Sequence, residues 1–163
     1  MSASTAQITN DSAHQVLTFV LGEETYGVDI LRVQEIRGWS AVTKIPQSQP
    51  HVLGVLNLRG SIVPIVDLRM RLNLEHAEYT PVTVIIVLSI VTGNGKRNFG
   101  VVVDGVSDVV DVNDSEVRPA PDLAGSSDYI RGLVPISERM VVLLDIDRLI
   151  AGDLARGATA EAA

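Results

Sequence analysis

The chain has 163 residues, a formal net charge of −7 and no cysteine. The acidic balance argues against a nucleic-acid binder, which needs a basic face, and the absence of cysteine excludes disulfides and thiolate metal sites. Apolar residues make up 46% of the sequence and aromatic residues only 4%, so aliphatic side chains must form the core. The longest apolar stretch, Val82–Val91, is about half as long as a membrane-spanning helix, and the N-terminus lacks a secretory signal. A cytoplasmic protein without membrane insertion is expected.

The first third of the chain is predicted to begin with a tail and continue into strands. Residues 1–14 are small and polar without a period, which predicts a disordered tail. A strand is predicted at Gln15–Leu21, followed by a turn and a second strand that starts at Tyr26 and runs toward Ile36. Part of this second segment also fits a helical turn. Pro46 and Pro50 bracket a polar loop.

The rest of the chain is predicted to consist mainly of hairpins. Asp67 is a candidate N-cap of a short helix, Leu68–Leu72, and a terminal helix is predicted to start at Asp145 or Asp147. Residues 151–163 are expected to be a frayed tail. About ten short strands with two short helices are typical of a mainly all-β fold built from small closed barrels. The predicted strands of this part are Val55–Leu58, Ile62–Val66, Val82–Ile90, Arg97–Val103, Val106–Val112, Ile130–Val134 and Met140–Leu144.

Two segments of the sequence repeat, which indicates a duplicated unit and not a solenoid. The Tyr26-Gly27-Val28 segment recurs 73 positions later as Phe99-Gly100-Val101. Val33 and Ile36 recur at the same spacing as Val106 and Val109. The segment from Gly54 to Asp67 recurs 78 positions later, from Gly132 to Asp145.

The sequence offers little catalytic chemistry. His14, His51 and His76 stand apart from one another without the closely spaced ligands that zinc requires, so no metal or cofactor is expected. No serine lies in a nucleophile elbow. A small hydrolase or transferase that uses the carboxylates of Asp29 and Asp104 remains the alternative hypothesis. A nucleic-acid-binding barrel is a third hypothesis, disfavoured by the charge. A binding module is favoured over an enzyme.

Arg59 is the residue that most invites a functional interpretation. It lies between two apolar strands in Leu58-Arg59-Gly60, where it is either a solvated turn residue or an anchor on a groove, since arginine binds carboxylates with two parallel hydrogen bonds. Alignment of the repeats from their aspartates places Ser137 opposite Arg59. The arginine is therefore not required by the repeated fold.

Several motifs, taken in their order along the chain, resemble those of the CheW family of chemotaxis coupling proteins, over about Gln15 to Ile150. The segments that carry the resemblance are Tyr26-Gly27-Val28-Asp29-Ile30, Val33-Gln34-Glu35-Ile36, Asn57-Leu58-Arg59-Gly60, Ile62 to Arg69, Gly100 to Val109, and Arg118-Pro119-Ala120-Pro121.

The resemblance implies a single domain, residues 15–150, with two interlocked SH3-like five-stranded β-barrels, short helices and a shared apolar seam. Read onto this chain, one barrel uses residues 15–45 plus 134–144, and the other uses residues 55–112.

The resemblance also implies a non-catalytic adaptor that is a monomer in isolation and joins membrane-associated receptor arrays. Its partners would be the regulatory domain of the histidine kinase CheA and the cytoplasmic hairpin of chemoreceptors. The kinase surface is expected at the barrel ends, without assigned residues. The receptor-binding positions that the resemblance implies are Val33, Glu35, Gly54, Arg59, Gly60, Ile62, Gly100, Val106 and Val109.

Overall fold

The computed structural model describes residues 13–46, 50–72, 74, 78–92, 95–119 and 129–150. Most of the predicted N-terminal tail, the predicted tail 151–163 and residues 120–128 lie outside the described residues. The first strand begins at Ala13, where the prediction placed the end of a tail. Ala13 and His14 are part of the strand because they pair with Asn113 and Val112.

Ten strands make up most of the described chain, and the helical elements are short. Residues 146–150 are helical. No helix in the described ranges is long and apolar enough to cross a membrane. The elements are β1 (Ala13–Leu21), β2 (Glu24–Asp29), η1 (Ile30–Arg32), β3 (Val33–Gly38), β4 (Val52–Leu58), β5 (Ser61–Asp67), α2 (Leu68–Arg71), β6 (Val84–Thr92), β7 (Gly95–Val103), β8 (Gly105–Asn113), η2 (Asp114–Glu116), β9 (Ile130–Ile136) and β10 (Arg139–Leu144).

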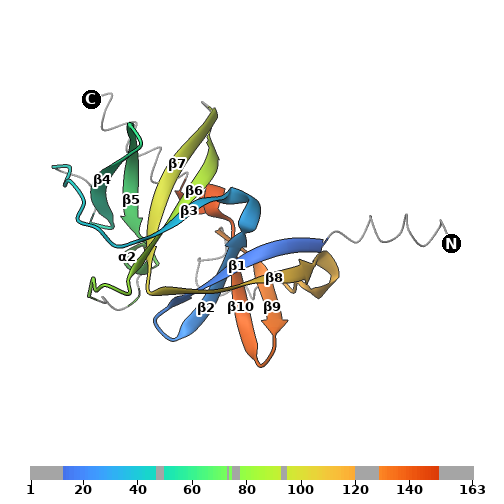
Figure 1. The fold of residues 1–163 in the computed structure, drawn as a ribbon. Coiled ribbons are helices and arrows are strands. Elements are labelled where there is room, and N and C mark those ends of the chain that lie inside the picture. The colour runs from blue at the N-terminus through green and yellow to red at the C-terminus, as the bar shows by residue number, and fades with distance from the viewer. Residues whose placement is uncertain are drawn as a thin grey trace.

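The strands form two five-stranded sheets, which occupy two lobes of the molecule (Figure 1). Sheet A has the order β8-β1-β2-β10-β9, and sheet B has the order β3-β6-β7-β5-β4. In each sheet two antiparallel hairpins meet through one parallel pair, β2 with β10 and β5 with β7. The two sheets are therefore equivalent strand by strand, as the duplicated sequence predicts.

The sheet order differs from the predicted partition of the chain in two strands. β3 lies within residues 15–45 but pairs with β6 in sheet B. β8 lies within residues 55–112 except for its last residue, Asn113, but pairs with β1 in sheet A. The reason is local. β2 ends at Asp29, whose carboxylate accepts a hydrogen bond from the Leu31 N–H and caps η1, so the chain turns out of sheet A before β3 begins. Each repeat thus gives two strands to one sheet and three to the other.

Three apolar clusters explain why the predicted strands are almost uninterrupted apolar runs. On β6, Ile85 and Val87 join a cluster on one face of sheet B, whereas Ile86 and Leu88 join a central cluster. The central cluster also contains Phe19 of β1, so it is shared by both sheets. A third cluster belongs to sheet A. Strands buried on both faces need apolar residues at successive positions and not at alternate ones.

The two edge strands of each sheet are linked by one bridge. Thr43, after β3, exchanges backbone hydrogen bonds of 2.9 and 2.8 Å with Val55 of β4. Arg118, after β8, exchanges hydrogen bonds of 2.7 and 2.8 Å with Leu133 of β9. These bridges bring opposite edges of each sheet together, which fits the SH3-like fold and satisfies backbone groups that an open edge would expose.

Repeated glycines lie where the backbone comes closest. A Cβ on Gly54 would overlap the Thr43 carbonyl oxygen, and the φ of +149° at Gly54 is one that other residues rarely adopt. A Cβ on Gly132 would lie 2.7 Å from the Arg118 carbonyl oxygen. The two glycines thus admit the bridges that close the sheets.

Candidate functional site

The turn between β4 and β5 presents Arg59 to solvent. Arg59 and Gly60 have φ angles of 55° and 87°, the positive values of a type I′ turn, and the Gly60 N–H donates to Asn57 Oδ1 at 2.9 Å. The Arg59 side chain is 83% exposed. Ser137, the equivalent residue of the β9–β10 turn, has a φ of 57°. The repeat therefore conserves the turn conformation but not the arginine.

Glu35 on β3 lies within reach of this turn. Its carboxylate is 3.5 Å from Arg59 Nη1 and 3.8 Å from Arg37 Nη1, and its side chain is 25% exposed. β3 and β4 are the opposite edges of sheet B, so the closure of the sheet brings the turn over β3. The result is a short row of alternating charges along this edge, with Arg59 at its outer end.

The apolar residues of the predicted site divide between the two sheets. Ile62 on β5 is 63% exposed and follows the Arg59 turn directly. Val33 on β3 and Val106 on β8 are half-buried and pack against the central cluster, and Val109 on β8 is 49% exposed. β3 and β8 each follow a hairpin of one sheet but pair in the other sheet, and we call them the exchanged strands. The three valines therefore lie where the chain passes from one sheet to the other.

Two predicted site residues are buried and pack within the fold. Gly54 lies at the Thr43 bridge. Gly100 on β7 faces Ile65, and a Cβ there would lie 2.5 Å from the Ile65 Cδ1 atom. The structure thus brings Glu35, Arg59, Gly60 and Ile62 to one exposed edge of sheet B. It places the two glycines beneath the surface.

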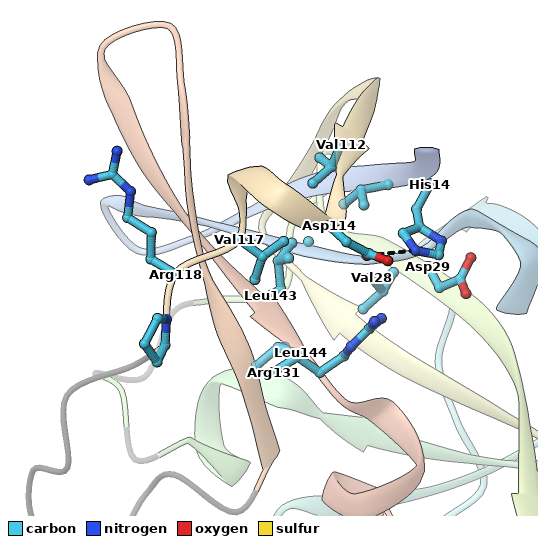
Figure 2. A pocket seen from close by; sticks show the side chains of 13 residues that line it. His14, Val28, Asp29, Val112, Asp114, Val117, Arg118, Arg131, Leu143 and Leu144 are labelled. Atoms are coloured by element: carbon cyan, nitrogen blue, oxygen red, sulfur yellow. Dashed lines mark ion pairs between the residues drawn. The ribbon is translucent and has the colours of Figure 1, made fainter. Parts of the chain in front are cut away.

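A pocket lies at one end of sheet A, and Figure 2 shows the side chains that line it. Its volume is about 340 Å³. Its floor is apolar and includes Val16 and Leu143, and its rim is charged. On the rim, His14 Nε2 lies 2.8 Å from Asp114 Oδ1. Arg118 and Arg131 also line the pocket and make no ion pair within the described residues.

The pocket was not predicted from the sequence. The sequence pattern places His14 in a tail without an acidic partner, whereas β1 begins at Ala13 and so carries His14 to Asp114. Arg131 and Asp114 come from segments that only the fold of sheet A brings together. One feature of the repeat could have indicated the pocket. Arg131 is 78 positions after Leu53, so a position that is apolar in one repeat is charged in the other.

The equivalent end of sheet B is filled by aromatic rings. Trp39, which is 73 positions before Val112 of the pocket, stacks on Tyr79 with ring centroids 4.3 Å apart and planes at 15°. Leu53 packs against the same cluster. Where sheet B has Trp39 and Leu53, sheet A has Val112 and Arg131 and an open cavity.

A largely buried network joins Arg69 to Asp67, Asp104 and Tyr79, and so includes one carboxylate of the enzymatic hypothesis, Asp104. Arg69 is 1% exposed and bonds both oxygens of Asp67 at 3.0 Å, while its Nη1 donates to Asp104 Oδ1 at 2.8 Å. The Tyr79 hydroxyl donates to Asp67 at 2.5 Å, and the other oxygen of Asp104 accepts from the Gly22 N–H.

The network shifts the titration of two of its members. Burial by itself would lower the pKa of Arg69, but the hydrogen bonds and charges of Asp67 and Asp104 raise that pKa above its ordinary value. Burial, together with the hydrogen bond to Asp67, raises the pKa of Tyr79 to about 12. The predicted cap at Asp67 is confirmed, since its carboxylate accepts from the Arg69 N–H at 3.0 Å.

The carboxylates of the alternative, enzymatic hypothesis are not brought together. Asp29 ends β2 and caps η1, whereas Asp104 binds the turn that precedes β2, so the two lie at opposite ends of that strand. Within the described residues, no group of three or more histidine or acidic side chains could hold a metal ion.

The two equivalent sheets, their exchanged strands and their shared central cluster define a duplicated SH3-like β domain. Residues 15–153 match the model of a family described as the CheW-like domain. The chain belongs to this family, as the resemblance in its motifs predicted.

Relatives with known names support the same assignment. The chemotaxis protein CheW of Klebsiella aerogenes is 45% identical over 141 residues, which cover 85% of this chain and 82% of the relative. The chemotaxis protein CheW of Rhizobium meliloti is 36% identical over 155 residues, or 94% of this chain and 97% of the relative. A crystal structure of the scaffolding protein TtCheW from Thermoanaerobacter tengcongensis superposes with a TM-score of 0.78 and 26% identity, covering 85% of this chain and 93% of that one.

Proposed function

We propose that this chain is a non-catalytic adaptor that couples the cytoplasmic hairpin of chemoreceptors to the histidine kinase CheA. Membership of the CheW family supports the proposal, as does the likeness to a solved relative described as a scaffolding protein. In this role the protein is cytoplasmic, monomeric in isolation, and recruited to receptor arrays at the membrane.

One observation supports the receptor contact most directly: Arg59 projects from a fixed turn next to an exposed isoleucine. A two-residue turn with both φ angles positive is rigid, so the backbone that carries the Arg59 side chain has a defined position. Ile62 and Glu35 lie beside it. An amphipathic helix can bury apolar side chains on such an edge while charged pairs set its orientation.

The receptor-binding positions separate into contact residues and supporting residues in this proposal. Gly54 and Gly100 support the surface from below, because both are buried. The contact residues are Val33, Glu35, Arg59, Gly60, Ile62, Val106 and Val109.

The open end of sheet A is our candidate for the kinase contact, which the resemblance places at a barrel end. The pocket offers an apolar floor to a side chain of the partner. Arg118 and Arg131 stand on its rim without an ion pair in the described ranges, so they favour acidic neighbours on that partner. Sheet B lacks this opening because Trp39 and Tyr79 fill its equivalent end.

The receptor contact is tested with Arg59→Ala. The side chain is 83% exposed, so the fold and its unfolding midpoint should stay unchanged. Affinity for a receptor hairpin fragment should fall about tenfold, since charged interface arginines are frequent hot spots. Arg97→Ala, at an exposed arginine of β7, is the matched control. Wild-type affinity of a folded Arg59→Ala protein would refute the assignment.

The kinase contact is tested with Arg131→Leu, which places the residue type of Leu53 on the pocket rim. Affinity for the regulatory domain of CheA should fall, and affinity for the receptor fragment should not. If Arg131→Leu instead loses receptor binding and keeps kinase binding, the pocket of sheet A is the receptor contact, and the assignment of the two surfaces is the wrong way round.

A further inference from the structure

A partly exposed ion pair joins both sheets at the start of β3. Arg32, the last residue of η1, donates to both carboxylate oxygens of Asp147 at 3.0 and 2.6 Å and to the Ser89 carbonyl at 3.2 Å. The carboxylate of Asp147 also accepts from the Val91 N–H at 2.9 Å. The pair thus connects the helix after β10 with β6 and with the first residue of β3, which is Val33.

The other repeat contains a similar connection with the charges exchanged. Arg69 is 78 positions before Asp147, the spacing that relates Asp67 to Asp145. Its partner Asp104 is 72 positions after Arg32, one position short of the spacing of 73 that relates Val33 to Val106. Asp104 directly precedes β8, as Arg32 directly precedes β3. Each exchanged strand is therefore anchored just before its first residue by the helical turn that follows β5 or β10 of the other repeat.

Each exchanged strand also carries a β-bulge just after this anchor. The register shifts at Gln34 in β3 and at Ser107–Asp108 in β8. A bulge re-aims the side chains that follow it. In β8, the Thr18 hydroxyl donates to the Asp108 carbonyl and accepts from its N–H, both at 3.0 Å. The position that faces the β3 bulge is Val87, which has no hydroxyl.

The bulge in β3 therefore depends more on the anchor that precedes it. We infer that Arg32 and Asp147 are positioning residues for receptor recognition. They fix the start of β3 and so hold Val33 and Glu35 in the orientation that contacts the receptor. This inference rests on the proposed receptor contact. Arg32 and Asp147 are 30% and 27% exposed, so their pair adds less to global stability than the 1%-exposed Arg69 with its partners Asp67 and Asp104. Loss of the Arg32–Asp147 pair should therefore change the geometry of β3 before it destabilises the fold.

The test is a double-mutant cycle of Arg32→Gln and Asp147→Asn in the full chain, titrated with a receptor hairpin fragment. Each single variant should bind about five- to tenfold more weakly, and the double variant should bind no more weakly than the worse single one, because both changes break one pair. Asp147→Glu keeps the carboxylate and should recover most of the affinity. Arg148→Gln, on the same helix and 71% exposed at its side chain, is the matched control.

Two further measurements distinguish a positioning role from a direct role in kinase binding. Backbone amide shifts of residues 33–36 should move in Arg32→Gln without ligand, while those of β8 stay in place. Arg32 and Asp147 also line a cavity of about 260 Å³ that shares Asp29 and Arg131 with the open pocket. Loss of kinase binding with wild-type receptor binding would overturn the inference and assign the pair to that cavity.

The outcomes also distinguish this inference from the proposed function. A wild-type chain that fails to bind the receptor fragment contradicts the proposed function itself. Wild-type receptor affinity in folded Arg32→Gln, together with unmoved amide shifts in β3, contradicts the positioning role alone. Additive losses in the double-mutant cycle would likewise overturn it, because they would mean that the two residues act separately.

Discussion

Sheet A and sheet B are built from equivalent strands, yet equivalent ends of the two sheets differ in whether side chains fill them. Sheet B is filled by Trp39, Leu53 and Tyr79, whereas sheet A has an open pocket with charged residues on its rim. The β4–β5 and β9–β10 turns differ in the same manner, since the position of positive φ is Arg59 in the first and Ser137 in the second. Positions that the repeats share form the fold, and positions at which they diverge are the best candidates for partner contacts.

The two inter-sheet anchors show the same contrast in energetic terms. The first anchor joins Arg69, which is 1% exposed, to Asp104 and to the fully buried Asp67, whereas Arg32 of the second anchor is 30% exposed. The aspartates that complete the two anchors, Asp104 and Asp147, are similarly exposed, at 26% and 27%. An uncompensated buried charge is far more costly than an exposed one. We therefore expect the buried anchor to control stability and the exposed one to control the local geometry of β3.

The largest expected effect comes from breaking the buried anchor. Arg69→Met should lower the free energy of unfolding by about 3–5 kcal/mol, because the carboxylate of Asp67 stays buried without its cation. Arg32→Gln should lower it by about 1 kcal/mol. Urea denaturation at pH 7 measures both values. Equal losses in the two variants would contradict the contrast between the anchors.

The closing bridges provide the next comparison. Gly54→Ala should cost about 2–3 kcal/mol, since it adds a clash with the Thr43 carbonyl to an unfavourable φ. Gly132→Ala should cost about 1–2 kcal/mol, because one of its close neighbours is the movable Val117 side chain. Thermal unfolding with calorimetry checks the order. The receptor affinity of folded Gly54→Ala should match that of the wild type. A selective loss of receptor affinity would mean that Gly54 is a contact residue and not a supporting one.

The filled end of sheet B should make stability depend on alkaline pH. The pKa of Tyr79 is about 12 in the folded protein, above the ordinary value of 10.0. The folded state therefore binds this proton more tightly, and the contribution of Tyr79 is complete below pH 10 and is lost as the pH rises toward 12. Tyr79→Phe should flatten the decline of the urea midpoint between these values. Tyr129→Phe is the control, and a decline in Tyr79→Phe identical to that of the wild type would contradict the assignment.

The smallest expected effect distinguishes the two turns. Ser137→Gly and Arg59→Gly should each raise stability by about 0.5 kcal/mol, because glycine adopts a positive φ without a steric cost. Only Arg59→Gly should weaken receptor binding. Denaturation and a receptor titration on both variants test this. Equal weakening by Ser137→Gly would mean that the turn conformation, and not the guanidinium, governs recognition.

Local patterns were enough to predict the hairpins and the cap at Asp67, because strand alternation, turn residues and helix capping act over a few positions. The repeat also predicted correctly that Ser137 corresponds to Arg59, and both residues have a positive φ. The exchange of β3 and β8 was not predicted. It depends on a three-residue helical turn, η1, in a segment whose pattern fits both a strand and a helix.

The candidate site was predictable to a smaller extent. Arg59 stood out because the repeats differ there, and the resemblance supplied Glu35 and Ile62. The pair of Arg32 with Asp147 spans 115 positions, and no local pattern reports a contact of that separation. Gly54 and Gly100 carried no sign of burial in the sequence, since a glycine required for close packing looks the same as one exposed to a ligand.

The exchange of strands has a consequence for how such a chain could have arisen. A single repeat would supply strands to two sheets and complete neither of them. Two separate copies could reach the same architecture only as a strand-swapped homodimer, in which each subunit fills the gaps of the other. Joining the copies end to end turns that dimer into one chain and removes its dependence on concentration. The fused chain is then free to change one copy without the other, and the solitary Arg59 and the open end of sheet A are such changes.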